Sequence, residues 1–200
     1  MKWHQDPCVG EACLGEAEMG LFLEALSFSA HRHRNQRRKG DGGEPYLNHL
    51  IRVVEILWTV GCVRDLTTLV AAMLHDVLED TDATAREIEV RFGPQVLAVV
   101  QEVTDDKSLP KTVRKEQQVL RAPDCSSRAK LVKLADKIHN LLALSRDPPA
   151  DWTEARMVDY IDWSERVVAG LRGVNEALEI AFDDAARGAR ARIAVQSGEL

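Results

Sequence analysis

Apolar residues recur along most of this chain at intervals of three or four positions, the spacing that places them on one face of an α-helix. No run rich in valine, isoleucine and threonine alternates with polar residues between two turn signals, as the strands of a hairpin would. The pattern therefore predicts an all-α fold.

Turn residues and helix caps divide this pattern into elements. Helices are expected over about residues 19–36, 46–60, 66–81, 84–92, 94–104, 111–120 and 126–145, and from residue 152 onward with a break at 170–173. Asp65 can cap the third of these, and Thr84 with Glu87 has the spacing of a capping box. The loop "KGDGGEP", residues 39–45, holds three glycines and a proline, so we expect it to be irregular.

The length of 200 residues suits one domain with its own core. We expect residues 19–184 to form this domain, residues 1–18 to be a flexible extension and residues 185–200 to fray. No apolar run approaches the roughly 20 residues that span a bilayer, and the amino terminus lacks the apolar stretch of a signal peptide. The sequence therefore predicts a cytoplasmic protein without a membrane partner.

The charge is acidic overall and uneven along the chain. A net charge of −6 argues against a stable nucleic-acid partner, whereas "HRHRNQRRK", residues 31–39, is strongly basic. Such a segment suits a small anionic ligand, and it is equally consistent with a solvated helix end that binds nothing.

The stretch "LVAAMLHDVLEDT", residues 69–81, begins as a buried apolar run and ends in ionisable side chains. On one continuous helix, His75, Asp76, Glu79 and Asp80 would form a single polar stripe, because residues four apart lie one above the other. Burying three carboxylates is prohibitive unless cations neutralise them. A metal ion would serve this purpose.

A second helix offers matching groups. Asp136 lies among apolar residues in "AKLVKLADKIHNLLAL", and Asn140 follows one turn later. Oxygen ligands here, with a histidine and an aspartate from the other helix, suit manganese, iron, magnesium or zinc. The remaining ligand stays open among the other histidines. The candidates are His31, His33, His49 and His139, of which His49, at a helix start beside core residues, stands out.

The order His49, His75-Asp76, Asp136 resembles the H…HD…D signature of HD-domain metal-dependent phosphohydrolases. More narrowly, four longer blocks resemble the stand-alone small alarmone hydrolases of the RelA/SpoT family, which include the animal SpoT homologue. These blocks are "QRRKGDGGEPYLNH", "AAMLHDVLEDT", "EVTDDKSLPKTVRKEQQVLRAP" and "KLVKLADKIHNL". The likeness spans about residues 21–182 and implies a single HD-domain bundle of about eight to ten helices.

The resemblance also implies an activity, the metal-dependent removal of pyrophosphate from the 3′ position of ppGpp and pppGpp, leaving GDP or GTP. It implies one divalent ion, typically Mn²⁺, and an alarmone nucleotide as the binding partner. The implied metal ligands are His49, His75, Asp76 and Asp136. The carboxylates implied to position and deprotonate the attacking water are Glu79 and Asp80. The implied substrate contacts are Arg38, Lys39, Lys111, Asn140, Arg156 and Tyr160.

The chain departs from the family pattern at two places. Leu50 follows His49 where the family commonly has proline, and the glycine-rich loop is longer than the usual "KSGEP" form. The longer loop affects the direction in which the side chain of Lys39 points. Neither change removes a metal ligand.

Other interpretations remain open from the sequence. The chain could be an HD phosphohydrolase that acts on (p)ppApp or on the 2′-phosphate of NADPH, or a non-catalytic nucleotide-binding regulatory module. The retained metal set and the Glu79-Asp80 pair argue against the regulatory module. Arg38 and Lys39 could simply be solvated, and Tyr160 could be a core residue. The sequence is compatible with both a monomer and a homo-oligomer.

Overall fold

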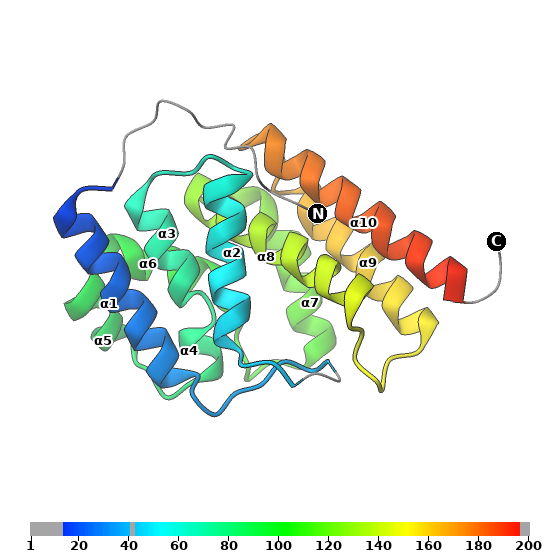
Figure 1. The fold of residues 1–200 in the computed structure, drawn as a ribbon, viewed down its shortest axis with the longest axis horizontal. Helices are drawn as coiled ribbons and strands as arrows, with labels where there is room; N and C mark the ends of the chain where they lie inside the picture. The colour runs from blue at the N-terminus through cyan, green and yellow to red at the C-terminus, as the bar shows by residue number, and fades with distance from the viewer. Residues whose placement is uncertain (1–13, 41–42, 197–200) are drawn as a thin grey trace.

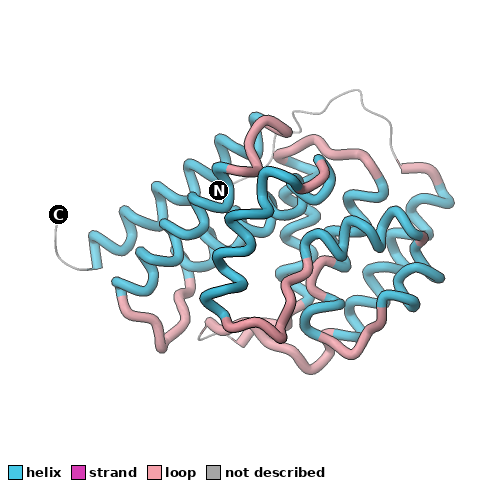
Figure 2. Tube along the Cα trace, turned by 180° about the vertical axis from the view of Figure 1, so that it is seen from behind, coloured by secondary structure: helices cyan, strands magenta, loops and turns pink. Residues whose placement is uncertain are grey.

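The computed structural model describes residues 14–40 and 43–196. Over these ranges the chain forms ten α-helices and one short 3-10 helix, and its only β pairing is an isolated bridge between Arg37 and Pro45 (Figures 1 and 2). The predicted all-α fold with eight to ten helices is confirmed.

The α-helices are α1 (Glu16–Arg32), α2 (Leu47–Thr59), α3 (Leu66–Leu74), α4 (Val77–Asp80), α5 (Ala85–Phe92), α6 (Pro94–Val103), α7 (Lys111–Arg121), α8 (Ser127–Arg146), α9 (Glu154–Ala169) and α10 (Glu176–Gln196), with a 3-10 turn at Ala122–Asp124. The predicted caps are present. The side chain of Asp65 accepts from Thr68 N, and Thr84 and Glu87 form a capping box.

The prediction of one continuous helix over residues 66–81 is wrong. α3 ends at Leu74, and α4 is a separate turn that begins at Val77. At the break, His75 Nδ1 lies 2.7 Å from the carbonyl oxygen of Ala72 and hydrogen-bonds to it. This bond competes for the carbonyl that the backbone N–H of Asp76 would use in a continuous helix. The break therefore changes the directions in which the side chains that follow it point.

The chain ends also differ from expectation. α1 already begins at Glu16 and ends at Arg32, four residues before the predicted end, with His33 as its C-cap. α10 continues to Gln196, so the prediction of fraying is wrong for residues 185–196. Ala185, Ala189 and Ile193 are buried, and α10 packs along α8 (Figure 1). Residues 1–13 and 197–200, the rest of the two expected flexible ends, lie outside the described residues.

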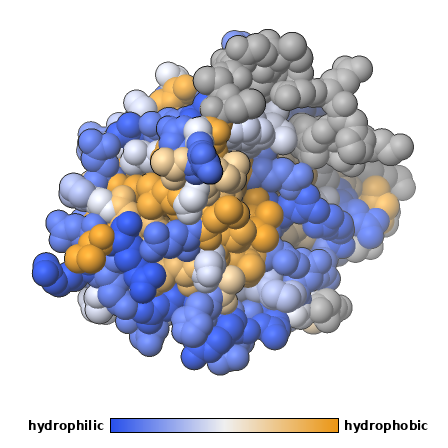
Figure 3. All heavy atoms as spheres, turned by 60° about the vertical axis from the view of Figure 1, so that its left-hand side comes forward, coloured by the Kyte–Doolittle hydropathy of each residue, from blue (hydrophilic) through white to orange (hydrophobic). Residues whose placement is uncertain are grey.

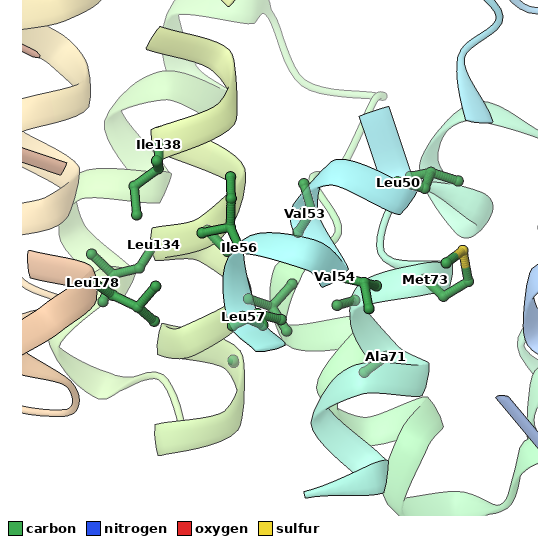
Figure 4. Close-up of a cluster of buried hydrophobic side chains, with 14 of the residues drawn as sticks. Leu50, Val53, Val54, Ile56, Leu57, Ala71, Met73, Leu134, Ile138 and Leu178 are labelled. Atoms are coloured by element: carbon green, nitrogen blue, oxygen red, sulfur yellow. The ribbon is translucent and has the colours of Figure 1, made fainter. Parts of the chain in front are cut away.

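In the core, α2 packs against α3 on one side and α8 on the other, and α8 also packs against α3, α6, α9 and α10. Figure 4 shows Val53 and Leu57 of α2 among the buried side chains of α3, α8 and α10. These same elements carry the residues of the predicted metal site. His49 lies in the first turn of α2, His75 follows α3, and Asp136 lies in the middle of α8. The core packing therefore fixes the distances between these residues.

An apolar groove of about 340 Å³ lies between α1 and α2, away from this polar site. Figure 3 shows apolar side chains gathered on this face of the molecule. Met19 and Ile51 line the groove and are about two-fifths exposed. None of the helices in the described ranges is long and apolar enough to cross a membrane.

Replacing Leu57 by alanine should lower the free energy of unfolding by about 2–5 kcal/mol, because this fully buried side chain would leave a cavity between α2 and its neighbours. Urea unfolding measures the change. The matched control is Leu120→Ala, at a side chain that is 59% exposed, for which we expect a change within about 0.5 kcal/mol. Equal effects of the two substitutions would contradict the described packing.

Candidate functional site

Four side chains from three parts of the core converge on one point. His49 Nε2 lies 3.2 Å from Asp136 Oδ1 and 3.6 Å from Asp76 Oδ2. His75 Nε2 lies 3.1 Å from Asp76 Oδ2 and 3.8 Å from Asp136 Oδ1. The structure thus brings all four sequence-predicted metal ligands together, although the helix between His75 and Asp76 is broken.

The residues present fit a divalent cation. Within the described residues, His75 Nε2 is buried and makes no well-directed hydrogen bond, although Asp76 Oδ2 lies 3.1 Å away, while its Nδ1 is bonded to the carbonyl of Ala72. Because a carbonyl only accepts, Nδ1 carries a hydrogen, so Nε2 is the nitrogen through which His75 would ligate a cation beside the two carboxylates. Two imidazole nitrogens and two carboxylate oxygens are a donor set that suits manganese, iron or zinc.

The electrostatics of the cluster also call for a cation. Burial raises the pKa of Asp76, but the neighbouring His75 outweighs this and holds the pKa below its usual value. For Asp136, burial is likewise outweighed by Lys137 and the two histidines, so its pKa lies well below the usual range. Both carboxylates are therefore ionised. Lys137 Nζ, 3.1 Å from Asp136 Oδ2, balances one of the two charges. A proton on His75 balances the other, because Asp76 and Asp136 outweigh burial and raise the pKa of His75 well above its usual value. A divalent cation bound at Nε2 would take the place of that proton.

The cluster opens into a cavity of about 160 Å³, which we call the metal cavity. It is lined by Tyr46, His49, His75, Asp76, Glu79, Val103, Asp105, Gln118, Val132, Lys133, Asp136, Lys137 and Asn140. Glu79 is held in its wall, because Oε2 accepts from the backbone N–H of Asp105 at 3.1 Å and Oε1 accepts from Arg114 at 3.4 Å. Burial, with a smaller contribution from Asp105 and Asp76, raises the pKa of Glu79. A raised pKa makes this carboxylate a stronger base than an exposed glutamate.

Asp80 points elsewhere. Its Oδ2 accepts from Gln36 Nε2 at 2.8 Å, and its Oδ1 pairs with Lys107. Consecutive helical residues differ by about 100° in direction, so Glu79 faces the metal cavity while Asp80 faces the neighbouring opening. The two predicted catalytic carboxylates are therefore adjacent in sequence but not in one cavity.

That neighbouring opening is a cleft of about 460 Å³, which we call the long cleft. Its wall includes Arg38, Lys39, Tyr46, His49, Asp80, His139, Asn140, Trp152 and Tyr160. Arg38 donates to Asn140 Oδ1 at 2.8 Å, and Asn140 Nδ2 donates to Asp136 Oδ1 at 2.7 Å. The glycine-rich loop is thereby connected to a predicted metal ligand through two hydrogen bonds. Lys39 lines the cleft and is exposed.

A third pocket, of about 270 Å³, lies beyond Asp105 and Gln118, which also line the metal cavity. We call it the basic pocket, because Lys111, Arg114, Lys115 and Arg156 line it beside Trp152, Tyr160, Trp163 and Asp159. Burial and the charge of Arg156 lower the pKa of Lys111. The crowding of positive charges in this pocket favours an anionic ligand. Tyr160 lies between the two openings, since it lines both the long cleft and the basic pocket.

Sequence reasoning missed several groups of this site. The hydroxyl of Tyr46 donates to Asp76 Oδ2 at 2.6 Å. The ring of Tyr46 stacks on His33, which is buried rather than solvated. Arg114 and Lys115 could have been found, because they lie about one helical turn after Lys111. Lys137, one residue after Asp136, is buried against the carboxylate of Asp136.

The structure also distinguishes among the four histidines that the sequence left as candidates for the remaining metal ligand. His49 lies in the cluster, whereas His31 is exposed and His33 packs on Tyr46. His139 is buried, with its Nδ1 2.7 Å from His49 Nδ1. Burial and the neighbouring His49 lower the pKa of His139 to about 3.

Comparison with known proteins places this arrangement in a family. The family model described as HD domain matches residues 25–161. The mouse protein named guanosine-3′,5′-bis(diphosphate) 3′-pyrophosphohydrolase MESH1 is 52% identical over 166 residues, which cover 83% of this chain and 93% of the mouse protein. A Brucella melitensis protein named GTP pyrophosphokinase rsh is 33% identical over 168 residues, covering 80% of this chain but 22% of its own length.

A solved structure extends the likeness to three dimensions. It is described as a metazoan orthologue of SpoT that hydrolyses ppGpp, and it matches with a TM-score of 0.83 and 46% sequence identity. The match covers 88% of this chain and 97% of the other. This chain therefore belongs to the HD-domain family and, within it, to the small alarmone hydrolases of the RelA/SpoT family.

Proposed function

We propose that this chain hydrolyses ppGpp and pppGpp at the 3′ position, giving pyrophosphate and GDP or GTP, with one divalent ion, Mn²⁺, as its cofactor. The observation that carries the proposal is the cluster of His49, His75, Asp76 and Asp136 at the meeting point of a polar cleft and a basic pocket. The 52% identity to a protein named for this reaction supports the same substrate. A cytoplasmic location and the lack of a stable nucleic-acid partner remain predictions, and a homo-oligomer remains compatible with the chain.

The four cluster residues would hold the cation. When bound, it lowers the pKa of a water molecule and polarises a phosphoryl oxygen. The surrounding residues keep the ligands in place, since Tyr46 donates to Asp76 and both Asn140 and Lys137 bond to Asp136. Two of these bonds reach the same oxygens, Asp76 Oδ2 and Asp136 Oδ1, that face the histidines, so they hold the carboxylates in the orientation that a cation would need.

Glu79 is the group that accepts the proton from the attacking water. It lines the metal cavity, and its raised pKa favours proton uptake. Water attacks the phosphorus bonded to the 3′ oxygen, the bond between them breaks, and the proton that Glu79 took from the water is passed on to the 3′ oxygen, which leaves as a hydroxyl. Pyrophosphate is the other product. Asp80 has a positioning role in this proposal, because it anchors Lys107 and Gln36 beside the long cleft.

Different parts of the substrate bind in the two openings, the long cleft and the basic pocket. The nucleoside lies in the long cleft near Arg38, Lys39 and Asn140. Phosphate groups that do not reach the cation are met by Lys111, Arg114, Lys115 and Arg156 of the basic pocket. The rings of Tyr160 and Trp152, which meet edge to face, lie where the openings adjoin. This division places the highest density of positive charge beside the most highly charged part of the substrate.

A substrate panel tests the proposal. The purified, Mn²⁺-loaded chain is offered ppGpp, ppApp and NADPH in parallel, with His75→Ala as the blank, and products are separated by ion exchange. We expect pyrophosphate and GDP from ppGpp, and neither product in the blank. Turnover of ppApp or NADPH alone would assign the site to that substrate instead. If the chain binds one Mn²⁺ but leaves all three substrates intact, the proposal that it hydrolyses these nucleotides is wrong.

Glu79→Gln should lower kcat for ppGpp by about 10²- to 10⁴-fold, because the amide cannot accept the proton. Affinity for Mn²⁺ should stay within about threefold, since Glu79 is not among the ligands. Initial-rate kinetics and a Mn²⁺ titration measure the two effects. Glu89→Gln, at an exposed glutamate of α5, is the matched control and should leave both unchanged. Wild-type turnover in Glu79→Gln would remove Glu79 from the mechanism.

Arg156→Ala should raise KM for ppGpp by about 10- to 100-fold, the loss expected for a hydrogen bond to a charged group. Arg166→Ala is the control on the same helix, because Arg166 lies on the surface with Glu116 as its partner. Steady-state kinetics at fixed Mn²⁺ compare the two variants. An unchanged KM in Arg156→Ala would show that the basic pocket does not bind the substrate.

A further inference from the structure

His139 is a buried histidine that the mechanism above does not use. It lies on α8, three residues after Asp136, so both side chains project from the same side of the helix. Its Nδ1 is 2.7 Å from His49 Nδ1, and the two rings are 4.9 Å apart between centroids with an angle of 40°. Among the described residues, His139 is the only hydrogen-bond partner of this nitrogen of His49.

The distance between the two nitrogens determines where the hydrogen lies. At 2.7 Å exactly one of the two must donate and the other must accept. His49 directs its other nitrogen, Nε2, at Asp136 Oδ1 and the centre of the cluster. A histidine that ligates a cation through Nε2 carries its hydrogen on Nδ1. His49 is therefore the donor and His139 the acceptor, and the hydrogen of His139 lies on its Nε2.

Other contacts of His49 cannot replace this bond. Tyr46 and His75 meet its ring at an angle, with centroids 5.5 Å and 5.2 Å away. These contacts restrict the plane of the ring, but they offer no acceptor to Nδ1. Without His139, the Nδ1 hydrogen of a fully buried side chain would have no partner, or the hydrogen would move to Nε2 and occupy the ligating lone pair.

We propose that His139 is a positioning residue that fixes the tautomer and the orientation of His49 and thereby raises the affinity of the site for its cation. The inference rests on the proposed metal centre and adds a residue to it. An acceptor of this kind is more commonly a carboxylate or a backbone carbonyl. A neutral histidine does the same without adding a third negative charge to the cluster.

Substitutions at His139 can distinguish the role of its Nδ1 from that of its Nε2. Asparagine places an amide oxygen near the position of Nδ1 and keeps an acceptor for His49. Glutamine places its amide farther along, near the position of Nε2, and phenylalanine keeps the ring with no acceptor. Leu141→Met, at a buried position of the same helix, is the control for a change of core packing.

The dissociation constant for Mn²⁺ is measured on each metal-free protein by competition with a chromogenic chelator, and thermal unfolding checks the fold. We expect His139→Phe and His139→Gln to weaken Mn²⁺ binding by about 10- to 100-fold, the loss that follows removal of such a partner. His139→Asn and Leu141→Met should stay within about threefold of the wild type. At saturating Mn²⁺ the kcat of His139→Phe should recover most of the wild-type value.

The outcomes distinguish this inference from the proposed function. Wild-type affinity in both His139→Gln and His139→Phe would overturn the role of His139 and leave the metal centre intact. If the phenylalanine variant does not fold, the Mn²⁺ affinities of His139→Asn and His139→Gln still test the inference. Equal affinities in these two variants would also overturn the role of His139. A wild-type chain that binds no Mn²⁺ would overturn the metal centre and this inference together.

Discussion

Two ionised carboxylates set into a helical core, with less than a fifth of each side chain exposed, are the constraint on which the rest of this structure depends. Asp76 and Asp136 lie beside two buried histidines, and their charges must be compensated where they lie. Hydrogen bonds from Tyr46 and Asn140 and the charge of Lys137 satisfy part of this need. The remaining charge faces the centre of the cluster, where a proton on His75 compensates it and a divalent ion would take that proton's place.

This constraint explains the arrangement of the surrounding elements. α2, α3 and α8 pack against one another, and this packing brings His49, His75 and Asp136 within a few ångströms of one another. The chain breaks its helix at His75, and the bond from His75 to Ala72 leaves Nε2 free to face the cluster. The long cleft and the basic pocket lie on the two sides of the metal cavity. A nucleotide with phosphates at two positions matches that layout, since its reacting phosphate can reach the centre while its other charges meet the lysines and arginines.

The sequence predicted the helical fold and the candidate metal ligands, which the structure brings together, for a physical reason. Polar residues such as Asp136 are conspicuous within an apolar helical pattern, because burial of a charge requires a partner. The prediction that His75 to Asp80 form one polar stripe on a continuous helix was nevertheless wrong, because a hydrogen bond from the His75 side chain interrupts the helix. The helical end of the chain was also missed. There the buried face of α10 is made largely of alanine, whose small side chain gives a weak apolar signal.

The supporting contacts could not be predicted because they join residues far apart in sequence. The bond between His49 and His139 spans 90 residues, and that between Tyr46 and Asp76 spans 30. A local pattern contains no information about such pairs. His33 illustrates the difficulty, because it belongs to a basic run that suggests solvent exposure, yet it is buried against Tyr46.

The most direct test of the account is the position of the cation itself. Crystals grown with Mn²⁺ would be measured for anomalous scattering at the manganese absorption edge. The account predicts one strong peak per chain within coordination distance of His49 Nε2, His75 Nε2, Asp76 and Asp136. A saturated crystal with no peak there, or with its only peak at another site, would contradict the claim that these buried carboxylates exist to hold a metal ion.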